Sequence, residues 1–341
     1  MELKRLSEQT IVITGASSGI GLVTARSLAR RGARLVLAAR SEEALKKLAD
    51  EINGAGGEAV AVVADVGREE DVRRIAETAI RRFGGFDTWI NNAGVSIYGK
   101  LMEVSVEDMR QLFETNFWGV VYGSLAAARH LRGRGGVIIN VGSTVSDRAI
   151  PVQGIYSASK HAVKGFTDAL RMELEADELP IHVTLVKPAA IDTPYTQHAR
   201  NYMETEPEVP PPVYAPEVVA EAILHCTEHP EREVFACGGG KALSVAEKYA
   251  PRLTDKYMEQ FMIDQQKSDK PPRAPGHDGL YRPSAGGRLE ERGGYEGHVA
   301  ESSLYTKASL HPLLVTAVAV GAGLAIAALL RQSQSNGHQR G

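Results

Sequence analysis

Two residues that can exchange a proton with a substrate stand four positions apart in the segment YSASK, residues 156–160. In a helix, this spacing places the phenol of Tyr156 and the ammonium group of Lys160 on one face. A phenol with a pKa of about 10 is a poor base at neutral pH, but a neighbouring positive charge favours its phenolate. Ser143 ends the preceding predicted strand and offers a hydroxyl to the same substrate oxygen. Because a Tyr-x-x-x-Lys pair alone is common on helix surfaces, this interpretation depends on the neighbouring motifs.

A glycine-rich turn, TGASSGIG at residues 14–21, follows an apolar strand and precedes a helical pattern. Gly15 permits a tight turn, while Gly19 and Gly21 let the main chain approach a phosphate and let the helix lie close to the sheet. The N–H groups of the turn and the positive end of the helix can hold a pyrophosphate. An ordinary turn is the alternative. We therefore expect a dinucleotide site at Gly15, Ser17, Ser18, Gly19, Ile20 and Gly21.

The end of the second predicted strand indicates which dinucleotide is bound. A site that selects an unphosphorylated ribose usually presents an acid here, whereas this chain has Ala38, Ala39 and Arg40. Arginine offers a permanently charged, forked donor to a ribose 2′-phosphate. The sequence therefore predicts NADP(H) in preference to NAD(H). The alternative is that Arg40 only faces water at the strand end.

Apolar strands alternate with amphipathic helices over most of the chain. Right-handed crossovers place helices on both faces of a parallel sheet, so this alternation predicts an α/β domain with a doubly wound parallel sheet. Long helices are expected at 106–131 and 156–176. Strands are expected at 11–14, 34–40, 58–66, 87–94, 135–143, 181–188 and 233–239.

Seven segments match, in order, the motifs of one family. The chain resembles the short-chain dehydrogenase/reductase family from about residue 6 to about residue 240. This resemblance implies a Rossmann fold, a nicotinamide cofactor, and hydride transfer between the nicotinamide and a carbonyl or alcohol carbon. The matching segments are TGASSGIG (14–21), Asp65-Val66, NNAG (91–94), Asn116, Ser143, YSASK (156–160) and PAAIDT (188–193).

The resemblance also implies a role for each matched residue. Tyr156 is expected to be the general acid and base, with Lys160 binding the nicotinamide ribose and lowering the pKa of the tyrosine. Ser143 steadies the reacting oxygen, and Asn116 holds a water that joins the lysine to solvent. Cofactor contacts are implied for Asp65 and Val66 at the adenine, Asn92 and Gly94 along the cofactor, and Ile191 and Thr193 at the carboxamide.

Three positions depart from the family pattern. Many members have Ser-Ser where this chain has Gly142-Ser143, and Pro-Gly where it has Pro188-Ala189. The second change lies at the nicotinamide end and affects the contact expected of Ile191. Ser18 stands where many NADP-dependent members carry a basic residue, which leaves Arg40 as the main candidate for the 2′-phosphate.

The composition indicates which kinds of partner the protein binds and in which cellular compartment it is found. The 39 basic and 42 acidic residues of the 341-residue chain nearly balance, which gives no indication of nucleic-acid binding. Cys226 and Cys237 are the two cysteines, too few for a secreted disulfide framework, and no His/Cys cluster has metal spacing. The charged start MELKRLSEQT does not resemble a signal peptide, so we expect the catalytic domain in the cytoplasm. The family resemblance implies a small-molecule substrate and a homo-oligomer.

The chain divides into a catalytic domain at 1–262, a flexible Pro/Gly-rich linker at 263–309, an apolar helix at 310–331 and a polar tail at 332–341. Within the domain, the irregular insert at 192–215 is expected to be a lid over the substrate. The linker is expected from its proline and glycine content. The alternative is that Tyr281, Tyr295 and Tyr305 anchor part of it on the enzyme.

Residues 313–330 read LLVTAVAVGAGLAIAALL, without a charge, an amide or a proline. Eighteen helical residues extend for about 27 Å, close to the thickness of a bilayer core. We therefore expect a single membrane span that anchors the catalytic domain on the cytoplasmic side. The alternative is a helix that covers an apolar patch of an oligomer.

Three functions remain open from the sequence. The first is a membrane-anchored, NADPH-dependent reductase of apolar ketones or aldehydes, or the corresponding alcohol dehydrogenase. The second is an enzyme of the same family that acts on a soluble substrate, with its tail used for localisation. The third is a non-catalytic scaffold that senses NADP(H), because binding modules can reuse enzyme folds.

Overall fold

A seven-stranded parallel sheet forms the centre of the computed structural model, which describes residues 3–274, 276–283 and 288–311. The strand order is β10-β7-β6-β4-β1-β2-β3, and every neighbouring pair runs parallel. This confirms the predicted doubly wound α/β fold. The strands are β1 (Thr10–Thr14), β2 (Arg34–Ala39), β3 (Glu58–Val63), β4 (Thr88–Asn91), β6 (Gly136–Val141), β7 (Ile181–Pro188) and β10 (Glu233–Ala236).

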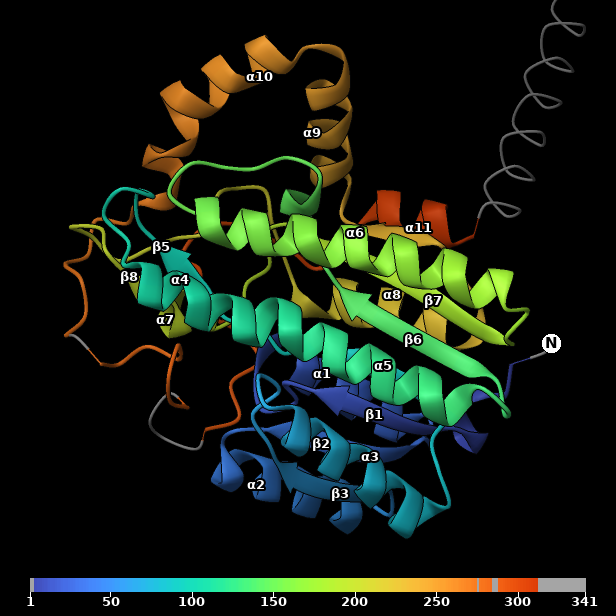
Figure 1. Ribbon diagram of the computed structural model, residues 1–341. Coiled ribbons are helices and arrows are strands. Elements are labelled where there is room, and N and C mark those ends of the chain that lie inside the picture. Colours follow the sequence, from blue (N-terminus) through green and yellow to red (C-terminus); the bar gives the residue numbers. More distant parts are fainter. Residues whose placement is uncertain (1–2, 275, 284–287, 312–341) are drawn as a thin grey trace, which may run out of the picture.

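Helices cover both faces of this sheet (Figure 1). Alternate residues of β1 point to opposite faces, with Ile11 and Ile13 in one core and Val12 in the other. The first core is closed by α1 (Gly19–Arg30), α2 (Glu42–Gly54) and α8 (Pro216–Glu228). The second is closed by α3 (Glu69–Phe83), α5 (Gly119–Leu131) and α6 (Gly154–Ala176).

The long helix expected at 106–131 contains a widened turn. It consists of α4 (Val106–Phe113), a π-helical turn at Glu114–Trp118 and α5. A π-turn inserts an extra residue into the helix and is frequent at functional sites. Asn116 lies within this turn.

The insert at 192–215 and the C-terminal residues form small elements beside the sheet. The helices are α7 (Tyr195–His198), α9 (Gly238–Tyr249), α10 (Pro251–Tyr257) and α11 (Leu304–Leu310). Two short parallel pairs join distant segments: β5 (Ile97–Tyr98) with β8 (Arg200–Asn201), and β9 (Val213–Tyr214) with β11 (Val299–Ala300).

The described part of 263–309 lies on the catalytic domain, whereas its composition predicts a flexible linker. Its Tyr281 hydroxyl donates to Asp108 Oδ1 at 2.7 Å, and Thr306 Oγ1 accepts from the N–H of Cys237 at 2.9 Å. In Figure 1 this orange segment runs down the side of the domain towards α1 and α2. The tyrosine-anchored alternative therefore describes this arrangement better, since side chains and main-chain groups of the segment find partners on the domain.

No helix within the described ranges is long and apolar enough to cross a membrane. The predicted span at 313–330 lies outside the described residues.

Candidate active site

The carboxyl ends of the parallel strands open into one groove, where the predicted cofactor residues meet. The turn after β1 lies beside the ends of β2 and β4, because β1 pairs with both strands. The groove encloses about 530 Å³. Its lining includes most of the residues predicted to contact the cofactor: Gly15, Ser17, Ser18, Gly19, Ile20, Gly21, Arg40, Asp65, Val66, Asn92, Gly94 and Thr193.

The turn leaves no room for side chains at two of its glycines. Gly15 has a φ of 68°, and a Cβ there would lie 2.8 Å from the Cα of Ala93. A Cβ on Gly21 would lie 2.1 Å from the oxygen of Gly15. The main chain itself therefore forms this wall of the groove, as close approach to a pyrophosphate requires. The groove fits an extended dinucleotide.

Arg40 lies at the far end of the groove, half-buried beside Asp65. Its guanidinium donates to the main-chain oxygens of Leu280, at 3.2 Å, and Gly279. Burial lowers the pKa of Arg40, while the negative charge of Asp65 acts in the opposite direction. The residue predicted to bind a 2′-phosphate is therefore positioned by the C-terminal segment.

A second cavity, of about 210 Å³, adjoins the groove at the start of α6. Tyr156, Lys160 and Ser143 line it together. The ammonium nitrogen of Lys160 lies 5.7 Å from the ring centroid of Tyr156 and donates to Val141 O at 2.9 Å. The predicted i, i+4 placement on one helix face is therefore observed, with Ile191 also in the lining.

Asn116 is fully buried behind this cavity. Its Oδ1 accepts from the N–H of Val95 at 2.8 Å, and its Nδ2 donates to Val95 O at 2.9 Å and to Ser159 Oγ at 3.2 Å. A Cβ on Gly94 would lie 3.5 Å from Asn116 Oδ1 and 3.9 Å from Lys160 Nζ. The π-turn thus places Asn116 next to the catalytic helix. The water that the family resemblance implies at this residue stays a prediction.

Tyr195 is a neighbour of Tyr156 that the sequence analysis did not identify. The two ring centroids are 5.5 Å apart and the ring planes are inclined by 65°, an edge-on contact. Tyr195 also donates to Gln153 Oε1 at 3.2 Å, and Gln153 Nε2 donates to Gln266 Oε1 at 2.7 Å. The available signal was that Tyr195 follows the PAAIDT motif by two positions at the start of the insert. Nothing in its spacing indicated contact with Tyr156.

Burial dominates the protonation of the catalytic groups. It raises the pKa of Tyr156, while the neighbouring hydroxyl groups of Tyr195 and Ser143 act to lower it. Burial also lowers the pKa of Lys160 to about 8, because the charged ammonium loses water. Tyr156 is thus held in its neutral, proton-donating form, and Lys160 carries a charge that is costly to bury.

Known proteins resemble this chain in sequence. The sequence model described as short chain dehydrogenase matches residues 9–204. An uncharacterized oxidoreductase of Bacillus subtilis is 49% identical over 324 residues, which cover 94% of this chain and 90% of the relative. An 11-beta-hydroxysteroid dehydrogenase A of Sesamum indicum is 41% identical over 191 residues, which cover 55% of this chain and 54% of that protein.

Solved structures of similar fold are also oxidoreductases. A short chain dehydrogenase/reductase from Burkholderia phymatum, in complex with NAD, is 26% identical with a TM-score of 0.66 and covers 80% of this chain and 100% of its own. An alcohol dehydrogenase from the archaeon Thermococcus sibiricus, complexed with 5-hydroxy-NADP, is 30% identical with a TM-score of 0.59, over 67% and 95% of the two chains. The fold and the site define an oxidoreductase with a nicotinamide cofactor. The chain belongs to the short-chain dehydrogenase/reductase family.

Proposed function

We propose that this protein is an NADP(H)-dependent oxidoreductase that reduces the carbonyl group of an apolar ketone or aldehyde. The observation that carries the proposal is the junction of the two cavities at Tyr156. Ile20, Asn92, Gly94, Thr193 and Tyr195 line both of them. A dinucleotide in the groove and a carbonyl compound beside Tyr156 would therefore meet at one place.

A bound nicotinamide would supply or accept the hydride. Tyr156 gives its phenolic proton to the carbonyl oxygen as negative charge develops there, and takes it back in the reverse direction. Ser143 donates to the same oxygen and orients it. Lys160 and Asn116 hold the surrounding main chain, through Val141 and Val95 respectively, so that this geometry is fixed before substrate enters.

The preference for NADP(H) is supported by Arg40 at the end of β2. It lines the groove at the position where an NAD-selective site would present an acid. Its forked guanidinium matches a 2′-phosphate better than it matches a bare ribose hydroxyl. The Burkholderia structure contains NAD and the Thermococcus structure contains an NADP derivative, so the family fold accommodates either nucleotide.

The apolar character of the substrate is supported by the lining of the smaller cavity. Val145, Ile150, Val209, Pro210 and Met262 surround the space next to Tyr156. Such a surface gains free energy by excluding water, at roughly 25 cal/mol per Å² of apolar area. The name of the sesame relative, a hydroxysteroid dehydrogenase, is compatible with a large apolar substrate, although the alignment spans about half of that protein.

Attachment to a membrane through residues 313–330, a cytoplasmic catalytic domain and assembly into a homo-oligomer are further parts of this proposal. They rest on the sequence pattern and on the family resemblance.

The proposal is tested by turnover of the full chain with NADPH and NADH against a graded series of ketones. The series runs from short polar ketones to aryl and steroid ketones, and substrate-dependent loss of nicotinamide absorbance is followed. We expect kcat/KM to rise with apolar size and to be higher with NADPH. Equal rates on small polar and large apolar ketones would contradict the proposed substrate class. A preference for NADH would contradict the proposed cofactor.

A further inference from the structure

The C-terminal segment adds a wall to the dinucleotide groove. Its residues Arg273, His277, Gly279, Pro283, Arg288 and Glu290 line the same 530 Å³ cavity as the glycine-rich turn. We call residues 276–283 and 288–295 the strap. Resting on the function proposed above, we propose that the strap is part of the cofactor-binding site and controls how fast the dinucleotide leaves.

The first half of the strap is fixed at the adenosine end of the groove. The main-chain oxygens of Gly279 and Leu280 accept from Arg40, and the N–H of Gly279 donates to His198 O at 2.7 Å. The side chain of Leu280 is fully buried in a small apolar cluster with Val95 and Ile97. This half therefore cannot shift without breaking both a buried apolar contact and the hold on Arg40.

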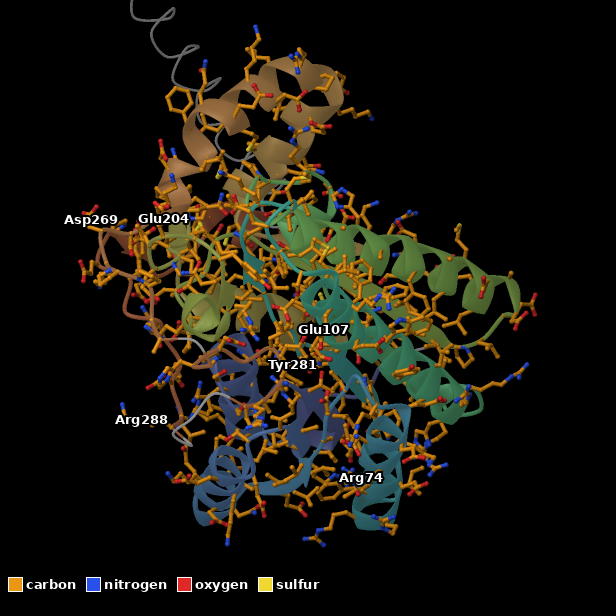
Figure 2. The ribbon with its side chains drawn as sticks, turned by 60° about the vertical axis from the view of Figure 1, so that its left-hand side comes forward. Arg74, Glu107, Glu204, Asp269, Tyr281 and Arg288 are labelled. Carbon is orange, nitrogen blue, oxygen red and sulfur yellow. The ribbon has the colours of Figure 1, made fainter. Side chains whose placement is uncertain are left out.

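Tyr281 extends this attachment onto α4. Its hydroxyl donates to Asp108 Oδ1, and the guanidinium carbon of Arg200 lies 5.7 Å from its ring centroid. In Figure 2 Tyr281 lies over the body of the domain near Glu107, with which it lines a surface pocket, whereas Arg288 lies at the outer edge of the molecule. The strap thus passes from the body of the domain to the outside of the groove.

The second half is fixed at the pyrophosphate end. The N–H of Gly19, the first residue of α1, donates to Glu290 O at 2.8 Å, and Ser18 and Glu290 form a parallel bridge. Glu291 pairs with Arg26 of α1 at 2.7 Å. The strap is therefore attached to the start of the helix that follows the glycine-rich turn, beside the groove that Ser18, Gly19 and Ile20 line.

The nicotinamide end is held through the loop after β7. Asp192 Oδ1 accepts from the N–H groups of Gly293, at 3.0 Å, and Tyr295, at 3.1 Å, and Gln197 Nε2 donates to Gly293 O at 2.7 Å. A Cβ on Gly293 would lie 2.3 Å from the oxygen of Thr193. Glycine is thus required for the strap to lie this close to the loop that carries Thr193.

These attachments lie at the elements that hold the cofactor, and the cavity between them stays open. A dinucleotide would therefore be enclosed between the glycine-rich turn and the strap, and its departure requires the strap to separate from α1 and from the β7 loop. Affinity differences in such enclosed sites arise mainly from the dissociation rate. The strap is expected to act on NADPH and NADH alike at the pyrophosphate end, because both share that group.

The test uses the full chain with two strap variants. Gly293→Ala forces the strap away from Thr193, and Glu291→Gln removes the ion pair with Arg26 while leaving the main chain unchanged. The matched controls are Gly54→Ala, where a Cβ meets no atom within 4 Å, and Glu43→Gln, which neutralises an exposed pair with Lys47. Release of NADPH is measured by stopped-flow displacement, and folding by thermal unfolding.

We expect NADPH release to be about tenfold faster in Gly293→Ala and about two- to fourfold faster in Glu291→Gln, with both controls at the wild-type rate. Amide hydrogen exchange at Gly293 and Tyr295 should slow when NADPH binds to the wild type. Should Gly293→Ala fail to fold, Glu291→Gln and the exchange measurement decide the result.

The inference would be overturned if the folded strap variants released NADPH at the wild-type rate or more slowly, and if NADPH did not slow amide exchange at Gly293 and Tyr295 in the wild type. If the wild type then still reduces ketones with NADPH, the proposed function stands without the strap. A wild type that binds neither dinucleotide would overturn both.

Discussion

The ammonium nitrogen of Lys160 lies 5.7 Å from the ring centroid of Tyr156, and both groups are enclosed by the same turns of α6 and the end of β6. Lys160 is only 4% exposed and makes a hydrogen bond to one main-chain oxygen. Its charge is therefore poorly compensated within the protein, and its pKa falls to about 8 from the ordinary value of 10.5. The buried lysine therefore lowers the stability of the fold, a cost that active sites often carry for the sake of the reaction.

Replacing Lys160 with methionine should therefore stabilise the fold at neutral pH. The folded-state pKa lies below the unfolded value, so the unfolded chain binds more protons between pH 8 and 10.5, and the penalty of burying the charge is complete below pH 8. That penalty is about 3 kcal/mol, from which about 1 kcal/mol is subtracted for the lost hydrogen bond to Val141. Urea unfolding across this pH range measures the difference, which should shrink as the pH rises. A Lys160→Met protein that is less stable than the wild type at pH 7 would contradict this account.

Tyr195→Phe should shift the pH dependence of alcohol oxidation upward. The Tyr195 hydroxyl lowers the pKa of Tyr156, so its removal leaves burial to raise that pKa further. Oxidation needs the deprotonated Tyr156, and its rate therefore rises only as the pH passes the pKa. The profile of kcat/KM with NADP⁺ should move to higher pH while NADPH binding is unchanged. An unshifted profile with a uniformly lower rate would indicate that Tyr195 serves only in packing.

Arg40→Ala should weaken NADPH binding selectively. A charge-assisted, forked hydrogen bond to a phosphate contributes roughly 1.5–3 kcal/mol, so the Kd for NADPH should rise by about 10- to 100-fold. The Kd for NADH serves as the internal control and should change by less than about threefold. Arg40→Lys, which keeps the charge but loses the fork, should give an intermediate value. Equal losses for the two nucleotides in a fluorescence titration would mean that Arg40 acts through Gly279 and Leu280 instead.

A buried amide network under the site should be costly to break. Asn91 Oδ1 accepts from Trp89 Nε1 at 2.7 Å, and Asn91 Nδ2 donates to Asn140 Oδ1 at 2.8 Å. Asn91→Ala leaves the buried indole N–H of Trp89 without its acceptor, while Asn140 Oδ1 keeps the hydrogen bond from Ser124 Oγ at 3.2 Å. We expect a cost of about 2–4 kcal/mol in the free energy of unfolding. Asn53→Ala removes two exposed hydrogen bonds to Ala59 and should cost about 1 kcal/mol or less. Similar unfolding midpoints for the two variants would be inconsistent with this view of the core.

The sheet and the cofactor turn could be predicted because their determinants are local. The run 11–14 followed by Gly15 predicts a strand and a turn from residue types alone, and the helical pattern expected after the turn is α1. The i, i+4 spacing of Tyr156 and Lys160 survives in the fold because both lie in the first turns of one continuous helix.

The π-turn at Asn116 could not be predicted in this way. Glu114–Trp118 are surrounded by an ordinary helical pattern, and the extra residue is accommodated through tertiary contacts of Asn116 with Val95 and Ser159. Those contacts join segments that are remote in sequence, and periodicity carries no information about them.

The strap was expected to be part of a flexible linker for a similar reason. Glycine and proline content predicts weak local structure, but many attachments of the strap use its main-chain groups. These are the oxygens of Gly279, Leu280 and Glu290 and the N–H groups of Gly293 and Tyr295, whose hydrogen bonds do not depend on side-chain type. The side-chain signal that did exist was the trio of tyrosines, of which Tyr281 is anchored on Asp108.

The central claim is that Tyr156 moves a proton while a nicotinamide dinucleotide occupies the adjoining groove. The measurement that tests it most directly compares wild type and Tyr156→Phe in NADPH binding and in single-turnover reduction of an apolar ketone. We predict a fall in the reduction rate of about 10²–10⁴-fold, with the Kd for NADPH changed by less than about threefold. A Tyr156→Phe protein that reduces the ketone at the wild-type rate, with the same NADPH affinity, would contradict the assignment of Tyr156 as the proton donor.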